Sequence, residues 1–223
     1  RLRGGRRRRG GTGMTRIAVL VSGGGTNLQA LIGARDRGAL GGGELAAVIS
    51  SKPDAYALER AKNAGIPGYV VARKDYDSNR AMTQALVAKL KELDIGLVVL
   101  AGFMHILTEE MVQAYPNAIL NVHPALIPSF CGAGYYGLHV HEKALAYGVK
   151  VTGATVHFVN EEPDGGPIVL QKAVDILPGD TPEVLQRRVM EQAEWHILPQ
   201  AVALFCQGRL SVEGRIVTIK EGE

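Results

Sequence analysis

The chain has 223 residues, 46% of them hydrophobic, which predicts one domain with a sizeable core. No apolar run approaches the roughly 20 residues that span a bilayer, and no signal-peptide pattern is visible, so we expect a soluble, cytoplasmic protein with no membrane partner. Cys131 and Cys206 stand far apart and outside any C-x-x-C spacing, which argues against a disulfide framework and favours two reduced thiols.

Charge is distributed unevenly along the chain. The formal net charge is +3, but residues 1–13 hold six of the 25 bases and no acid, which leaves 19 bases against 22 acids, a net of −3. We interpret residues 1–13 as a flexible Arg/Gly-rich arm that precedes one domain over residues 14–223. No aromatic residue interleaves the Arg run, so we expect no nucleic-acid partner.

Strand and helix patterns alternate from residue 16 onward. The expected strands are 16–22, 44–50, 68–71, 96–102 and 118–123, and the helices between them are 28–38, 54–65 and 79–93. A helix at 141–147, strands at 152–159 and 168–174, a long helix at 182–207 and a hairpin at 210–219 follow. This order predicts the α/β class, with an open, mostly parallel twisted sheet, helices on both faces, a long C-terminal helix and a terminal β-hairpin.

The segment VLVSGGGTNLQAL places a glycine turn between the first strand and the first helix. Such a turn presents backbone N–H groups and the positive end of a helix to an anion, while Thr26 and Asn27 add a hydroxyl and an amide. Leu28 stands where a dinucleotide fingerprint needs its third Gly, and Walker A is absent. The pattern favours a monophosphate over NAD or ATP, with a purely structural turn as the alternative.

Two polar side chains end the strand in ILNVHPALIP. Alternation along a strand places Asn121 and His123 on the same face. Asp164 lies in a P-D-G-G turn and could pair with His123, in which case the carboxylate would orient the ring and raise its pKa, although a plain turn is the alternative. His139 and His141 form an H-x-H pair without a third ligand at suitable spacing, so we expect no metal.

Together these segments resemble the glycinamide ribonucleotide transformylase family, the folate-dependent formyltransferases of purine synthesis. The resemblance runs from about residue 16 to 208 and rests on VLVSGGGTNLQAL, VVLAGFMHIL, ILNVHPALIP, TGATVHFV, PDGGPIVLQ and QAEWHILP. It implies a Rossmann-like formyltransferase fold, in a monomer or homodimer. It also implies transfer of a formyl group from the co-substrate 10-formyltetrahydrofolate to the amine of glycinamide ribonucleotide.

The resemblance also implies which residues act. Asn121 and His123 correspond to groups that stabilise a tetrahedral intermediate, and Asp164 to one that assists proton transfer. The implied contacts with the phosphate and ribose are Gly25, Thr26, Asn27 and Glu194. The implied folate contacts are Arg80, which would meet the glutamate tail, and Met104, His105, Ile106, Leu107, Asn121, Asn160, Glu161, Glu162, Pro163 and Asp164.

The chain departs from the family pattern at three places. His105 replaces a usual Arg, the loop after Pro128 is about five residues longer than in many relatives, and the helix before Glu194 is one residue out of step. Methionyl-tRNA formyltransferase and formyltetrahydrofolate hydrolase resemble the same catalytic domain, but each would need a further domain, so we expect neither. A noncatalytic nucleotide or RNA binder that uses the glycine turn and the arm is the alternative from another class.

Overall fold

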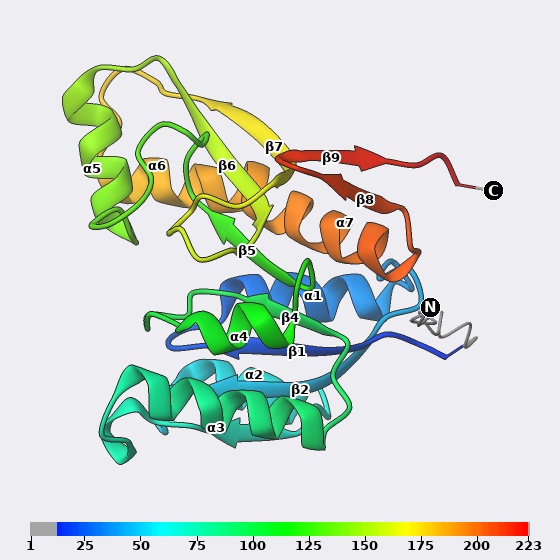
Figure 1. The fold of residues 1–223 in the computed structure, drawn as a ribbon. Coiled ribbons are helices and arrows are strands. Elements are labelled where there is room, and N and C mark those ends of the chain that lie inside the picture. The colour runs from blue at the N-terminus through cyan, green and yellow to red at the C-terminus, as the bar shows by residue number, and fades with distance from the viewer. Residues whose placement is uncertain (1–12, 223) are drawn as a thin grey trace, which may run out of the picture.

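One nine-stranded sheet runs through residues 13–222, the part of the chain that the computed structural model describes (Figure 1). Its spatial order is β3-β2-β1-β4-β5-β6-β7-β9-β8. The strands are β1 (Arg16–Val21), β2 (Glu44–Ser50), β3 (Gly68–Val70), β4 (Leu97–Leu100), β5 (Ile119–His123), β6 (Val151–Phe158), β7 (Ile168–Asp175), β8 (Leu210–Glu213) and β9 (Ile216–Ile219). The predicted arm over residues 1–13 lies, except for Gly13, outside the described residues.

Seven α-helices connect or follow these strands within residues 13–222. They are α1 (Thr26–Asp36), α2 (Tyr56–Asn63), α3 (Asn79–Glu92), α4 (Glu109–Ala114), α5 (Leu138–Tyr147), α6 (Pro182–Val189) and α7 (Trp195–Cys206). A 3₁₀ turn spans Arg73–Asp75 and a π-helical turn spans Met190–Glu194. None of the helices in the described part is long and apolar enough to cross a membrane.

The sheet is parallel where helices connect its strands. The pairs β2·β3, β1·β2, β1·β4 and β4·β5 are parallel, because each connection crosses over through a helix. The pairs β5·β6 and β6·β7 are antiparallel, and the hairpin of β8 and β9 joins the sheet through β9. The expected α/β class, with a mostly parallel sheet and a terminal hairpin, is confirmed.

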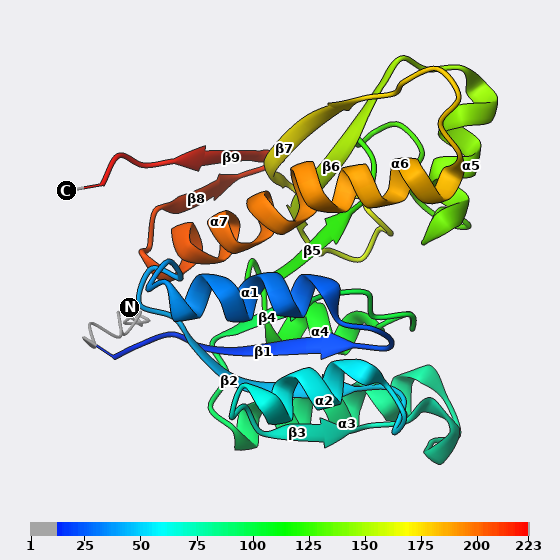
Figure 2. The same cartoon turned by 180° about the vertical axis from the view of Figure 1, so that it is seen from behind.

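Helices cover both faces of the sheet (Figures 1 and 2). On one face, the fully buried side chains of α3 follow helical spacing, with Met82, Leu86 and Leu90 in one apolar cluster, to which Met111 of α4 also belongs. The other cluster contains buried side chains of α1, α2, α6 and α7 together with Leu120 and Val122 of β5. Leu120 and Val122 therefore lie on one face of β5, and Asn121 and His123, which alternate with them, lie on the other face.

The long C-terminal helix that the sequence predicts is present, with one irregularity inside it. The π-helical turn Met190–Glu194 separates α6 from α7. A π turn accommodates an extra residue and rotates the side chains that follow it, and such turns are frequent at functional sites. The irregularity lies in the helical segment before Glu194, where we expected the sequence to be one residue out of step with many relatives. Sequence patterns missed the short helix α4.

The strand order places three chain segments at one edge of the sheet. β1 lies between β2 and β4, so successive strands are added first on one side of β1 (β2, β3) and then on its other side (β4, β5). Open α/β sheets bind ligands at the point where the strand order switches in this way. The carboxyl ends of β1, β4 and β5 lie next to one another there. The glycine turn, residues 101–104 and the LNVHP segment therefore meet at one place.

Candidate active site

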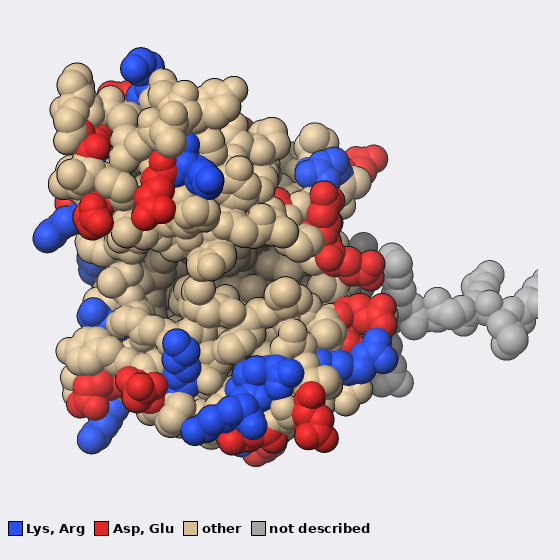
Figure 3. All heavy atoms as spheres, turned by 90° about the vertical axis from the view of Figure 1, so that its left-hand side faces the viewer, with Lys and Arg blue, Asp and Glu red and all other residues tan. Residues whose placement is uncertain are grey.

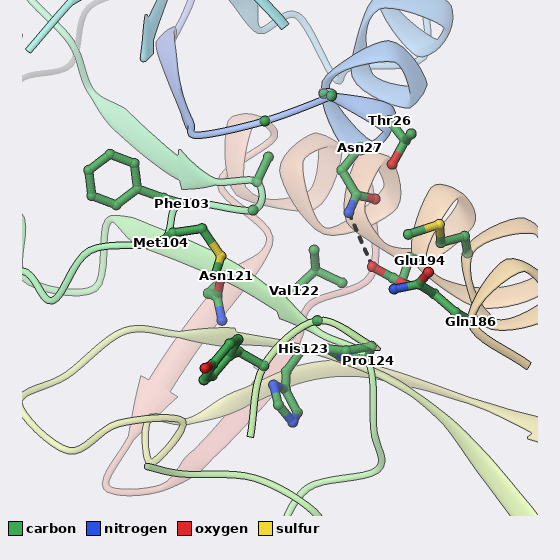
Figure 4. Close-up of a pocket in the computed structure, with 18 of the residues that line it drawn as sticks. Thr26, Asn27, Phe103, Met104, Asn121, Val122, His123, Pro124, Gln186 and Glu194 are labelled. Atoms are coloured by element: carbon green, nitrogen blue, oxygen red, sulfur yellow. Dashed lines mark hydrogen bonds between the residues drawn. The ribbon is translucent and has the colours of Figure 1, made fainter. Parts of the chain in front are cut away.

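A pocket of about 420 Å³ opens at this edge of the sheet. Figure 3 shows it as a hollow whose surface is largely without charged side chains. Its walls come from the glycine turn, the segment after β4, the end of β5, the loop before α5, and the helices α5 and α6 with the π turn. The phosphate-binding candidates and the catalytic candidates therefore line one cavity, although they are far apart in the sequence (Figure 4).

Helix α2 holds the glycine turn from behind. The Gly23 carbonyl accepts a hydrogen bond from the Ala57 N–H (3.0 Å), and the Gly24 carbonyl accepts one from Arg60 Nε (2.7 Å). In a trans peptide the N–H points opposite to the carbonyl, so the N–H groups that follow these two carbonyls point away from α2. Successive N–H groups oriented in this way, next to the first turn of α1, form an anion-binding concavity.

Gly25 is required by packing as well as by backbone conformation. It precedes α1 with φ of 76°, in the left-handed region that favours glycine. A Cβ at this position would lie 2.7 Å from Cβ of Ala57. Any larger residue would therefore push α1 and α2 apart, and we expect its effect to reach beyond phosphate binding. Gly25, Thr26 and Asn27 all line the pocket, and their phosphate contact stays a prediction.

Glu194 places a carboxyl group inside the protein at the pocket wall. It is only 5% exposed, and its Oε1 accepts a hydrogen bond from Asn27 Nδ2 (3.1 Å) (Figure 4). Its Oε2 has no hydrogen-bond partner among residues 13–222. Burial raises the pKa of Glu194 to about 7, despite the opposing effect of the Asn27 hydrogen bond. The π turn thus presents a carboxyl that can accept from a hydroxyl.

We expect Glu194→Gln to stabilise the protein at pH 8 and to leave its stability almost unchanged near pH 4. The unfolded carboxyl ionises near 4.5 and the folded one near 7, so the cost of holding the charge inside develops between these values. At pH 8 the full cost is about 3 kcal/mol. Thermal melts across pH 4–8, with the exposed Glu213→Gln as control, measure the difference. An equal difference at both ends of this range would contradict the buried-acid interpretation.

The catalytic candidates lie together at the ends of β5 and of the β6–β7 connection. Asn121 and His123 share a face of β5, and His123 Nδ1 is 3.6 Å from Asp164 Oδ2. Asp164 adopts φ of 53°, which Asp tolerates better than most residues. Its Oδ2 also accepts a hydrogen bond from the Gly132 N–H (2.9 Å). The structure thus brings together the three residues that the sequence pattern singled out.

His157 completes this cluster, although no pattern in the sequence indicated a role for it. It lies opposite Asn121 in the antiparallel pair β5·β6. Its Nδ1 donates to the Phe158 carbonyl (2.9 Å), so the neutral ring has a bare Nε2 that accepts from Asn121 Nδ2 (3.2 Å). The same Nε2 is 3.7 Å from Asp164 Oδ1. His157 therefore orients the Asn121 amide and lies beside the carboxylate.

Burial and nearby charges act in opposite directions on the pKa values of His123 and Asp164. Burial lowers the pKa of His123, and this effect outweighs the opposing charge of Asp164 and the hydrogen bond with Phe130. The carboxylate of Asp164 does act to raise the pKa of His123, as expected, but no pattern in the sequence indicated that burial would outweigh it. Burial alone would raise the pKa of Asp164, but His157 and His123 in their protonated forms, together with the Gly132 N–H, outweigh it and lower that pKa. Asp164 is thus held as an anion.

The loop after Pro128 contacts the catalytic candidates through its backbone. His123 Nε2 donates to the Phe130 carbonyl (2.7 Å), so Nδ1 is the ring nitrogen that faces Asp164. The Phe130 ring packs against Tyr135 and Tyr147, with centroids 6.4 Å and 5.8 Å apart. This loop therefore lies directly on the catalytic candidates and lines the pocket with Tyr135 and Tyr136.

Comparison with known proteins agrees with this arrangement. The family model described as formyl transferase matches residues 15–202. This chain belongs to the formyl transferase family. A phosphoribosylglycinamide formyltransferase from Haemophilus influenzae is 45% identical over 203 residues, which are 91% of this chain and 92% of that protein.

Solved structures of the family have the same fold. Glycinamide ribonucleotide transformylase 1 from Symbiobacterium toebii superposes with a TM-score of 0.88 at 46% identity, covering 93% of this chain and 95% of its own. A formyltetrahydrofolate deformylase from Pseudomonas syringae pv. tomato superposes with a TM-score of 0.84 but is only 25% identical, and the match covers 94% of this chain and 67% of that one. Among these formyl transferase relatives, this chain is therefore more similar to the transformylases than to the deformylase.

The residues that the family resemblance implies for folate fall into two groups. Met104, Asn121 and Asp164 line the pocket, and the Met104 N–H donates to Ser22 Oγ (2.9 Å). His105, Ile106 and Leu107 follow Met104 outside the lining residues, as does the 160–163 loop, in which Asn160 Oδ1 accepts from the Glu162 N–H.

Arg80, also implied for folate by the resemblance, is an exposed residue of α3 outside the pocket lining, where it pairs with Glu109 and Glu110. Near the pocket edge, burial lowers the pKa of His105, and the charges of Lys52 and Arg73 lower it further. No cluster of His, Cys, Asp and Glu in residues 13–222 is arranged to hold a metal ion.

Proposed function

We propose that this formyl transferase moves the formyl group of 10-formyltetrahydrofolate to the amine of glycinamide ribonucleotide, a step of purine biosynthesis. The observation that carries the proposal is one cavity with an anion-binding turn at one wall and the Asn121, His123 and Asp164 cluster at another. A ribonucleotide has a phosphate at one end and the reacting amine at the other, which suits this arrangement. The names of two similar proteins, one of them with a solved structure, support the same substrate.

The reaction forms one bond and breaks one. The amine nitrogen of the ribonucleotide attacks the formyl carbon, and the carbonyl oxygen becomes an oxyanion. The bond from this carbon to the folate nitrogen then breaks, the amine loses a proton, and the folate nitrogen gains one. The enzyme must therefore stabilise an oxyanion and move a proton, and no covalent enzyme intermediate is needed.

Asn121 and His123 supply the donors. Asn121 Nδ2 uses one N–H on His157 and keeps its second N–H for the oxyanion. His123 Nε2–H donates to the Phe130 carbonyl, and in the reaction the formyl oxygen takes that acceptor's position. Asp164, held as an anion, faces Nδ1 and favours the doubly protonated ring, which donates more strongly. Through water, Asp164 carries the proton from the amine to the folate nitrogen.

The remaining assignments follow from position. The N–H groups of the glycine turn with Thr26 and Asn27 bind the phosphate, and Glu194 accepts from a ribose hydroxyl. The folate enters over Met104, beside residues 105–107 and the 160–163 loop. Arg80 binds the glutamate tail once its exposed ion pairs with Glu109 and Glu110 open, which costs little for surface pairs.

A direct assay tests the proposal. The protein is mixed with glycinamide ribonucleotide and a 10-formyl-dideazafolate analogue, and release of the deformylated folate is followed. We expect turnover that requires the ribonucleotide. Release without it would indicate a deformylase, and turnover only with aminoacylated initiator tRNA would indicate the tRNA enzyme. No release with the ribonucleotide, with aminoacylated initiator tRNA or with water as the acceptor would contradict formyl transfer altogether.

A further inference from the structure

His141 is a buried polar side chain with no role in the chemistry described above. It lies on α5, is only 1% exposed and lines the pocket. Neither of its ring nitrogens has a hydrogen-bond partner among residues 13–222. Buried polar groups are nearly always paired, and one that is left unpaired at a ligand cavity is a candidate for ligand contact. The free protein therefore holds a binding group ready at the cavity wall.

The state of the ring narrows the kind of group that it can bind. Burial, together with the charge of His123, lowers the pKa of His141 to about 4. At neutral pH the imidazole is uncharged, with one N–H donor and one bare nitrogen acceptor. A phosphate or carboxylate offers acceptors alone and would leave the bare nitrogen without a donor. An amide can pair with either nitrogen of the neutral ring, because its carbonyl can accept from the ring N–H and its N–H can donate to the bare nitrogen.

We propose that His141 hydrogen-bonds the carboxamide of glycinamide ribonucleotide and so determines specificity for the glycinamide group. The assignment rests on the proposed function. This carboxamide links the ribose to the carbon that carries the amine, so it lies between the group held at Glu194 and the nitrogen that must reach His123. His141 lies near His123 and lines the same cavity, as this order requires. His141 is a contact for binding, and it takes no part in proton transfer.

The proposal predicts opposite effects on stability and on binding. In His141→Leu, an apolar side chain replaces an unpaired buried polar one, so the melting temperature should stay the same or rise. The KM for the ribonucleotide should increase about tenfold, and the KM for the formyl-folate analogue should stay unchanged. His141→Gln keeps a donor and an acceptor and should recover part of the affinity. His139→Leu, on the exposed side of the same helix, is the matched control and should change neither constant.

Steady-state kinetics and thermal melts on these three variants decide the matter. A lowered melting temperature with an unchanged ribonucleotide KM in His141→Leu would overturn the proposal, because it would make His141 a structural residue. Equal loss of folate affinity, or equal loss in His141→Gln and His141→Leu, would also overturn it. If the wild type fails to use glycinamide ribonucleotide, the proposed function fails and this assignment with it. If the wild type turns over normally and His141→Leu matches it, this assignment alone fails.

Discussion

Asp164→Asn is expected to lower kcat by about 10²–10⁴-fold, the range that a positioned proton-transfer group contributes, and to leave the fold intact. Asn tolerates the left-handed backbone conformation that Asp164 adopts, and its side-chain oxygen can still accept from the Gly132 N–H. What disappears is the negative charge that lies 3.6 Å from His123 Nδ1. The substitution therefore removes the negative charge of Asp164 with little change in the shape of the side chain.

The pH dependence of the remaining activity gives a second, independent measurement. Burial already lowers the pKa of His123, and the charge of Asp164 opposes that effect. Without that charge the pKa of His123 should fall further. If the doubly protonated ring is the active form, the pH above which kcat declines should then move downward in Asp164→Asn. An upward or absent shift would contradict the assigned pairing.

The control for this variant is Asp36→Asn, an exposed carboxylate that pairs with Arg35 at the far end of α1. It repeats the chemical change away from the pocket and should leave kcat unchanged. Turnover of Asp164→Asn close to that of the control would remove Asp164 from proton transfer. A large loss of melting temperature in Asp164→Asn would instead show that the carboxylate mainly holds the 130–132 loop through the Gly132 N–H.

Asn121→Ala is expected to lower kcat by about 10²–10³-fold, the usual effect of removing one oxyanion donor. If the amide meets the oxyanion only in the transition state, kcat and kcat/KM should fall together while KM stays nearly constant. His157 Nε2 would lose its hydrogen bond from Asn121, so a stability loss of about 1 kcal/mol accompanies the change. Kinetics and thermal melts on the same preparation measure both effects.

One result for Asn121→Ala would contradict the role of Asn121 as an oxyanion donor. A lower melting temperature with preserved turnover would make it a structural partner of His157, and His123 would then stabilise the oxyanion alone. The matched control is Asn63→Ala at the end of α2, which removes the same amide far from β5. That variant should show wild-type kcat and KM.

Local patterns in the sequence determined much of this protein. Alternating strand and helix periods specified the α/β class, because each period is set by which side chains face the core over a few residues. The glycine turn was recognisable because Gly25 must adopt a positive φ directly before a helix. The shared face of Asn121 and His123 also follows from strand alternation alone. Each of these features depends on neighbours within about ten residues along the chain.

Tertiary structure alone decided which distant groups meet. The antiparallel register of β5 and β6 places His157 against Asn121, and sequence spacing does not specify that register. The net pKa of His123 depends on how deeply the whole fold buries it, and this burial outweighs the expected effect of Asp164. The contacts of Phe130 and Gly132 use backbone atoms, which every residue carries, so no residue type in the sequence predicts them. Pairing across the chain is set by packing and strand register, and it therefore becomes visible only in the folded molecule.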